Sequence, residues 1–453
     1  MSTRGPVRWV HVRDAAAIVA RGGEEPVAGD LWVRGDEVVA VGAASPPEPP
    51  APGDEVVEID GRNLLVAPPF IDLHVHFREP GGEAAETIAT GRAAALAGGY
   101  GTVYAMANTQ PTCDTPDQAR QTARHADDES PVEVVPISAL SRGLRGQELV
   151  DLEAMAAAGI GAFSDDGAWL ADERLARDAF RWSAREGVPL WQHCEDFAVT
   201  GPGVVHACSC SEAAGLPGIP SASEVVAVER DLQLAADAGA PFHVCHLSTR
   251  GALELVRRAR ERGEPVTAEV TPHHLVLTVE DAVAGGTDFK MKPPLRDPSD
   301  VDALVDGLVD GTLGAIATDH APHTKEAKAR GWAKAPFGIV GLETAFAVLY
   351  SRLVQTGRLR LGRLVEALTA GPAAIAGRDT PGLVAPGRGA RLVLVDLEQR
   401  LPVHPADFRS RSHNTPFAGL ELAGWPLALL DGPRTHLIRS AADERIRTTR
   451  CGS

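Results

Sequence analysis

The feature that most constrains this chain of 453 residues is an alternation of apolar, strand-like runs with amphipathic, helix-like stretches. The strand-like runs end near His76, Asn108, Ala139, Asp166, His193, His246, Val270 and Asp319. Most of them are followed by a helix-like stretch, such as residues 222–238 or 250–262. Eight such units over about 290 residues predict a (β/α)8, TIM-like barrel of mixed α/β class. An open doubly wound sheet would normally need fewer strands and a Gly-x-Gly-x-x-Gly turn, which we do not find.

Both ends of the chain show a β-rich pattern instead. Residues 31–33 and 37–41 are apolar and flank Arg34-Gly35-Asp36, which predicts a hairpin. Residues 43–54 contain five prolines and are expected to form a loop. Residues 391–396 form another strand-like run near the other end. We therefore expect residues 1–65 and 370–453 to form one small, discontinuous β-domain beside a barrel made of residues 66–369.

Charge and composition exclude several functions. The chain has 44 Lys and Arg against 61 Asp and Glu, a net charge of −17, which repels phosphate backbones and anionic lipid. We therefore expect no nucleic-acid partner and no membrane partner. The absence of a signal-peptide pattern and of an apolar run of about 18 residues predicts a cytoplasmic protein. The six cysteines form no Cys-x-x-Cys pair and are expected to be reduced, as small core hydrophobes.

Histidines and aspartates recur where the predicted barrel strands end. His74 and His76 are two residues apart, so in a strand both rings project to the same face. The other residues of this kind are Asp165, Asp166, His193, His246 and Asp319. Each alone is explained by a core histidine, a turn or a helix cap, but barrel strands bring all these ends to one mouth. Their joint occurrence favours a Zn²⁺ site, and up to six ligands allow two ions that share a bridging oxygen.

Other polar residues surround the same predicted mouth. Arg78 follows the histidine pair by two residues and can hold a carboxylate through two parallel hydrogen bonds. Asn108 ends the second strand, and His323 follows Asp319 by four residues. We expect His273-His274 either to be structural or to support the ligands without binding the ion, because six ligands already suffice.

Taken together, these motifs resemble those of the dihydroorotases in the amidohydrolase superfamily. Residues 71–81, Ile-Asp-Leu-His-Val-His-Phe-Arg-Glu-Pro-Gly, are similar to one family signature, and residues 317–323, Ala-Thr-Asp-His-Ala-Pro-His, to a second. Further matches occur, in the family's order and spacing, at residues 163–167, 193–196, 246–249 and 335–343. The resemblance covers about residues 60–350. It is to the long bacterial type, found as a separate polypeptide or beside aspartate transcarbamoylase.

The resemblance implies a zinc-dependent cyclic amidohydrolase. The implied reaction is the reversible interconversion of (S)-dihydroorotate plus water and N-carbamoyl-L-aspartate, in de novo pyrimidine (UMP) biosynthesis. The implied ligands of Zn²⁺, two per subunit, are His74, His76, Asp166, His193, His246 and Asp319, with Asp166 as the bridging carboxylate. The implied substrate contacts are Arg78, Asn108, Lys292, His323, Phe337 and Gly338. Asp319 is also the implied catalytic residue, which takes a proton from the attacking water and gives it to the leaving nitrogen.

Two positions depart from the family pattern. Ala107 replaces the usual proline before Asn108, and Lys292 stands where many members have asparagine before Pro-Pro-Leu-Arg. Lys292 either reaches the substrate's carboxylate or extends into solvent.

Two alternative functions remain. One is a hydantoinase or allantoinase acting on another cyclic ureide. The other is a non-catalytic, dihydroorotase-like scaffold for aspartate transcarbamoylase, which would be expected to have lost ligands, whereas none of the six is missing. We expect a homo-oligomer acting on a small anionic substrate, with aspartate transcarbamoylase as a candidate partner.

Overall fold

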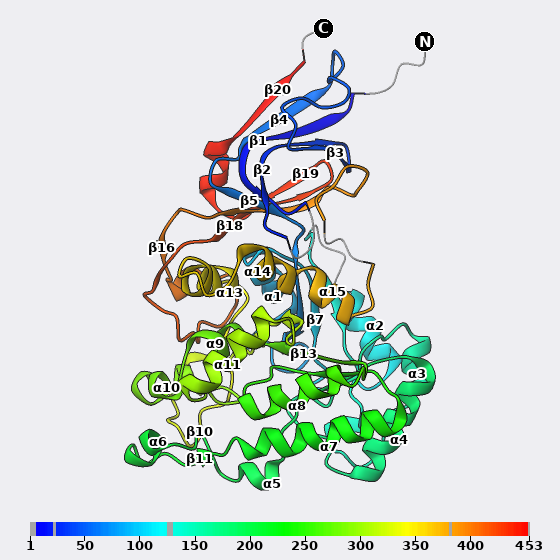
Figure 1. Cartoon of the computed structure of the whole chain (residues 1–453), viewed down its shortest axis with the longest axis vertical. Coiled ribbons are helices and arrows are strands. Elements are labelled where there is room, and N and C mark those ends of the chain that lie inside the picture. Colours follow the sequence, from blue (N-terminus) through cyan, green and yellow to red (C-terminus); the bar gives the residue numbers. More distant parts are fainter. Residues whose placement is uncertain (1–5, 21–23, 125–129, 380–382, 452–453) are drawn as a thin grey trace.

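The computed structural model describes residues 6–20, 24–124, 130–379 and 383–451, and Figure 1 shows how its elements are arranged. Its central feature is a ring of parallel strands. The strands are β6 (Phe70–Val75), β7 (Tyr100–Ala105), β8 (Glu133–Pro136), β9 (Leu190–Gln192), β12 (Phe242–Val244), β13 (Val266–Val270) and β14 (Ala315–Ile316). They pair in the order β6-β7-β8 and β9-β12-β13-β14. Phe163 bridges Ser138 to Leu190 at the fourth strand position, and His320 pairs with Val75 to close the ring. The predicted (β/α)8 barrel is confirmed.

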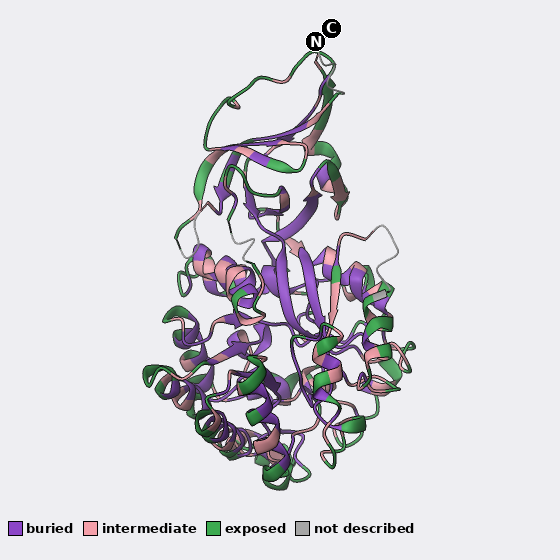
Figure 2. Ribbon diagram, turned by 90° about the vertical axis from the view of Figure 1, so that its right-hand side faces the viewer, coloured by how far each residue is buried: buried purple, intermediate pink, exposed green. Residues whose placement is uncertain are grey.

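Helices cover the outside of the barrel. They are α1 (Ile88–Ala97), α2 (Pro116–Arg124), α3 (Leu152–Ala157), α4 (Glu173–Glu186), α7 (Ala222–Ala238), α8 (Arg250–Glu261), α11 (Pro298–Val309), α14 (Leu361–Leu368) and α15 (Ala370–Ile375). Figure 2 shows the buried strands at the centre and the exposed outer faces of the helices around them. In α4, Asp172 caps the first turn by accepting from the Leu175 N–H, and Gly187, at φ 69°, ends the helix.

Shorter elements lie in the connections. They are α5 (Phe197–Thr200), β10 (Val205–His206), α6 (Ser209–Ala213), β11 (Gly218–Ile219), α9 (Pro272–Val276), α10 (Val279–Gly285), α12 (Lys325–Lys328) and α13 (Ala345–Leu349). In Figure 1, α5, α6, β10 and β11 lie at the end of the barrel away from the large sheet. In the part of the chain that is described, no helix is long and apolar enough to cross a membrane.

Strands from both ends of the chain share one nine-stranded sheet. They are β1 (Arg8–Ile18), β2 (Val27–Arg34), β3 (Glu37–Val41), β4 (Glu55–Asp60), β5 (Leu64–Ala67), β15 (Arg391–Asp396), β18 (Trp425–Asp431), β19 (Arg434–Leu437) and β20 (Ile446–Arg450). The order is β19-β18-β15-β5-β1-β2-β3, and β4 pairs with both β1 and β20. The expected hairpin is the pair β2 and β3. Two further strands, β16 (Leu401–Pro402) and β17 (Glu421–Leu422), form a separate small sheet.

The division into domains at residues 65/66 and 369/370 stays a prediction. Strand β5 extends across the first boundary and joins the large sheet, and β6 of the barrel begins three residues later. At the second boundary, α15 packs against β6 and β14 of the barrel. Because β6 follows β5 directly, the barrel strands begin next to the large sheet and end at the opposite side, where the mouth opens.

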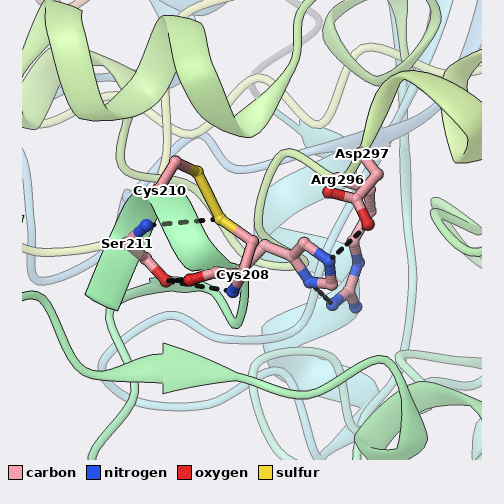
Figure 3. The surroundings of a disulfide bond; sticks show 6 residues. Cys208, Cys210, Ser211, Arg296 and Asp297 are labelled. Atoms are coloured by element: carbon pink, nitrogen blue, oxygen red, sulfur yellow. Dashed lines mark hydrogen bonds and ion pairs between the residues drawn. A yellow bond between two sulfur atoms is a disulfide. The ribbon is translucent and has the colours of Figure 1, made fainter. Parts of the chain in front are cut away.

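The expectation of six reduced cysteines is wrong for Cys208 and Cys210, which form a disulfide (Figure 3). Cys208 caps α6, with its Sγ accepting from the Ser211 N–H, and this turn places the two Cα atoms 5.4 Å apart. That separation is within the range that disulfides adopt. The pair has the spacing Cys-x-Cys, which differs from the Cys-x-x-Cys pattern on which the prediction was based. The free cysteines Cys113, Cys194 and Cys245 are buried, as expected.

Candidate metal centre

The two histidines at the end of β6 both direct Nε2 into the barrel mouth. Nε2 of His74 lies 3.2 Å from Oδ1 of Asp166, and Nε2 of His76 lies 3.1 Å from Oδ1 of Asp319. All four side chains are buried. The alternation of a strand explains this arrangement, because residues two apart share a face.

Asp166 lies between the remaining histidines. Its Oδ1 is 3.3 Å from Nε2 of His246 and 3.6 Å from Nδ1 of His193, while its Oδ2 is 3.4 Å from Nε2 of His76. Burial alone would raise the pKa of Asp166, but His74 and His246 hold it well below its usual value. With the contact to His74, the ionised carboxylate of Asp166 therefore lies next to all four histidines of the predicted ligand set.

Two of the predicted ligands have strained backbones. His246 has φ 33° and Asp319 has φ 48°, values that residues other than glycine rarely adopt. Such strain costs about 1–3 kcal/mol and is concentrated at functional sites.

The donor set fits a metal ion. His74, His76 and Asp319 form one group of ligand atoms within 4.8 Å of one another, and His74, Asp166 and His246 form a second. Nε2 of His74 is buried and makes no well-directed hydrogen bond, although Oδ1 of Asp166 lies 3.2 Å away. A buried nitrogen and carboxylate placed in this way suit two ligands of one ion better than a hydrogen-bonded pair. Neutral imidazole and carboxylate are the ligands expected of Zn²⁺ and similar ions.

Oxygen atoms hold the other ring nitrogen of three of these histidines. Oε1 of Glu269 lies 3.3 Å from Nδ1 of His74, and Oδ1 of Asn108 lies 2.9 Å from Nδ1 of His76. Oε2 of Glu195 lies 3.0 Å from Nε2 of His193. Such contacts fix which nitrogen a histidine offers to a metal.

Two of these partners, Glu195 and Glu269, were not predicted from the sequence. Burial would raise the pKa of each, but hydrogen bonds from His193 to Glu195, and from His243 and His74 to Glu269, hold both at about 2. The available signal was a glutamate within an apolar run, most clearly in Val-Thr-Ala-Glu-Val of β13.

A cavity of about 380 Å³ opens above the centre. Every predicted site residue except His74 lines it, and His74 is fully buried. The structure thus brings together the predicted substrate contacts Arg78, Asn108, Lys292, His323, Phe337 and Gly338 with the predicted ligands. A cavity of this size suits a small molecule.

Three of the cavity residues form one wall. Nε2 of His323 donates to the Phe337 carbonyl oxygen at 2.7 Å. Burial and the nearby Arg78 lower the pKa of His323 to about 3, so its ring is neutral at neutral pH. Arg78 donates through Nε to the Pro322 carbonyl oxygen at 3.3 Å.

Lys292 lines the same cavity rather than extending into solvent. Its Nζ is 3.3 Å from Oε1 of Glu195, and its side chain is 20% exposed. The same Nζ lies over the rings of Phe197 and Phe337, 4.5 and 5.0 Å from their centroids. The lysine therefore adds a positive charge beside the histidines.

His273 and His274 are buried outside the two ligand groups. Nδ1 of His274 lies 2.8 Å from Oγ1 of Thr271, and its Nε2 lies 3.1 Å from the Pro293 carbonyl oxygen. These contacts agree with a structural role for His274.

Known proteins resemble this chain in sequence over most of its length. Residues 62–252 match the family described as Dihydro-orotase-like. A dihydroorotase of a Geobacillus species is 44% identical over 403 residues, which cover 89% of this chain and 93% of that protein. A dihydroorotase of Bacillus cytotoxicus is 42% identical over 406 residues, 90% and 93% of the two chains.

Solved structures share the fold. An L-hydantoinase (dihydropyrimidinase) from Arthrobacter aurescens superposes with a TM-score of 0.81 at 24% identity, over 94% of this chain and 95% of that one. A D-hydantoinase (dihydropyrimidinase) from a Thermus species gives 0.77 at 26% identity, over 94% of each chain.

Proposed function

Because this chain belongs to the dihydroorotase family, we propose that it interconverts (S)-dihydroorotate plus water and N-carbamoyl-L-aspartate in pyrimidine biosynthesis. The observation that carries the proposal is the cavity in which Arg78 faces the buried His/Asp centre. A cyclic amide that bears a carboxylate matches both features. The His/Asp centre would act on the amide carbonyl, and Arg78 would bind the carboxylate.

We further propose that the centre holds two Zn²⁺ ions per subunit. The proposed ligands are His74, His76, Asp166, His193, His246 and Asp319. Five of them make up the two ligand groups, and His193 lies beside these groups, with its Nδ1 3.6 Å from Oδ1 of Asp166. Asp166 touches both groups, as a bridging carboxylate must. The bound metal supplies Lewis acidity and a lower pKa of water.

The chain's own residues hold the substrate and move the proton. Burial would raise the pKa of Asp319, but His76 and His74 hold it well below its usual value, so the carboxylate is ionised and accepts the proton of the attacking water. It then delivers this proton to the leaving ring nitrogen. Arg78 and Asn108 bind the substrate carboxylate, with Lys292, His323, Phe337 and Gly338 completing the cavity wall.

Metal analysis combined with a substrate comparison tests this function. The purified protein should contain zinc and should turn over dihydroorotate far faster than hydantoin or allantoin, because Arg78 needs a carboxylate partner. Faster turnover of hydantoin or allantoin would identify the hydantoinase alternative. A folded protein without metal and without turnover would identify the scaffold.

The assembly is also proposed here. We propose a homo-oligomer, with aspartate transcarbamoylase as a candidate partner. Sedimentation of the protein alone measures its oligomeric state, and sedimentation of a mixture with that enzyme measures binding.

A further inference from the structure

The segment between β16 and β17, residues 403–420, leaves and rejoins the small β16-β17 sheet and runs along the side of the barrel (Figure 1). Two buried glutamates hold it there. Glu343 accepts from the Ser410 N–H at 3.0 Å, and Glu86 accepts from the Arg411 N–H at 3.1 Å. Oγ of Ser412 donates to the Ala85 carbonyl oxygen at 2.6 Å. Buried carboxylates with backbone N–H partners fix this segment against the barrel.

Asn414 follows directly and joins two loops of the cavity wall. Its Oδ1 accepts from the His323 N–H at 3.1 Å, and its Nδ2 donates to the Gly338 carbonyl oxygen at 3.0 Å. The side chain is 5% exposed and does not line the cavity itself. It therefore uses both ends of its amide to connect His323 with Gly338.

Hydrogen bonds fix both the N–H and the carbonyl group of Gly338 in place. Its N–H donates to the Lys290 carbonyl oxygen at 2.9 Å, and its carbonyl oxygen accepts from Nζ of Lys328 at 2.9 Å as well as from Asn414. A carbonyl oxygen has two lone pairs, so this one is saturated. Gly338 thus shapes the cavity, and the position of its wall depends on the groups that hold it.

We infer that Asn414 is a positioning residue, which fixes His323 and Gly338 against the substrate from outside the cavity. This inference depends on the proposed function in one respect, namely that the substrate is dihydroorotate. Within the described residues, the side-chain hydrogen bonds of Asn414 go to His323, Ala321 and Gly338 and to no predicted metal ligand, so its loss should weaken substrate binding and leave the metal centre intact. Small displacements of a substrate-binding wall are costly because positioning depends on sub-ångström geometry.

The test compares Asn414→Ala with Ser412→Ala, which removes one partly buried hydrogen bond from the same segment but none to the cavity wall. In the zinc-loaded enzyme, Asn414→Ala should raise KM for dihydroorotate about tenfold with kcat changed less than about threefold, and zinc content should be equal in both variants. An unchanged KM, or an equal rise in Ser412→Ala, overturns the inference.

Hydrogen exchange supplies a readout that does not depend on turnover. The His323 amide should lose protection in Asn414→Ala and keep it in Ser412→Ala. Asn414→Asp, which retains an oxygen for that amide but cannot donate to Gly338, should keep the protection while KM stays raised. Protection that is equal in the parent and in Asn414→Ala contradicts the inference. A parent enzyme that is inactive on dihydroorotate refutes the proposed substrate, whereas the exchange result still decides whether Asn414 holds the wall.

Discussion

Replacing Gly338 with alanine should destabilise the protein and distort the cavity wall at once. Gly338 has φ 129°, a conformation that L side chains rarely adopt. An added Cβ would lie 2.6 Å from Cβ of Ala321, 2.9 Å from the Ala321 carbonyl oxygen and 3.1 Å from Nε2 of His323. Because the hydrogen bonds of the Gly338 peptide pin it on both sides, these neighbours must move instead.

The magnitude follows from two separate contributions. Backbone strain at a positive φ costs about 1–3 kcal/mol, and overpacking of a well-filled site costs about 1–3 kcal/mol more. We therefore expect Gly338→Ala to lower the free energy of unfolding by about 2–6 kcal/mol. The displacement of His323 should also lower kcat/KM for dihydroorotate by about tenfold or more.

Gly331 provides a matched control in the same connection. It has φ 77°, and an added Cβ would meet nothing within 4 Å, so Gly331→Ala carries the backbone strain without the clash. Urea unfolding of the two variants, with kcat/KM of each, separates the contributions. Two results would contradict this prediction. One is a difference in the free energy of unfolding between the variants of less than about 0.5 kcal/mol, the scatter of an ordinary surface substitution. The other is an unchanged kcat/KM in Gly338→Ala.

Substitutions at four further positions test the site and its support. His193→Ala should lose zinc and activity while far-ultraviolet circular dichroism stays unchanged; full activity in metal-stripped buffer would contradict this. Asp319→Asn should lower kcat far more than it raises KM in steady-state kinetics. Lys292→Ala should raise KM several-fold, an effect that high salt reduces, and Lys292→Asn should largely restore it. Burial raises the pKa of Glu343 to about 7, so the folded state retains a proton that the unfolded state loses above about pH 4.5. Stability should therefore fall between about pH 4.5 and 7, by up to about 3 kcal/mol, and urea unfolding of Glu343→Gln should lack this fall.

The barrel and the residues at its strand ends could be predicted because both signals are local. Apolar runs followed by amphipathic stretches define the strands, and His74, His76, His193 and His246 each stand at the end of one. Once the barrel closes, topology alone brings these ends together.

The residues that hydrogen-bond to the site residues could not be predicted in the same way, because they are distant from them in sequence. Glu269 is 195 residues from His74, and Asn414 is 91 residues from His323. No periodicity relates such pairs. The disulfide was missed for a different reason, since a Cys-x-Cys pair closes only when a local turn, here the start of α6, brings the two Cα atoms together.

The nine-stranded sheet has a consequence for synthesis of the chain. Strand β5 pairs with β1 on one edge and with β15 on the other, and β15 begins at Arg391, far behind Ala67 at the end of β5. Ribosomes add roughly 5–20 residues per second, so the second edge of β5 waits about 16–65 s for its partner. During that interval it exposes unpaired N–H and C=O groups, the template on which two nascent chains can pair with each other. The barrel emerges in the meantime, and its folding must proceed beside an unfinished sheet that only the last part of the chain completes.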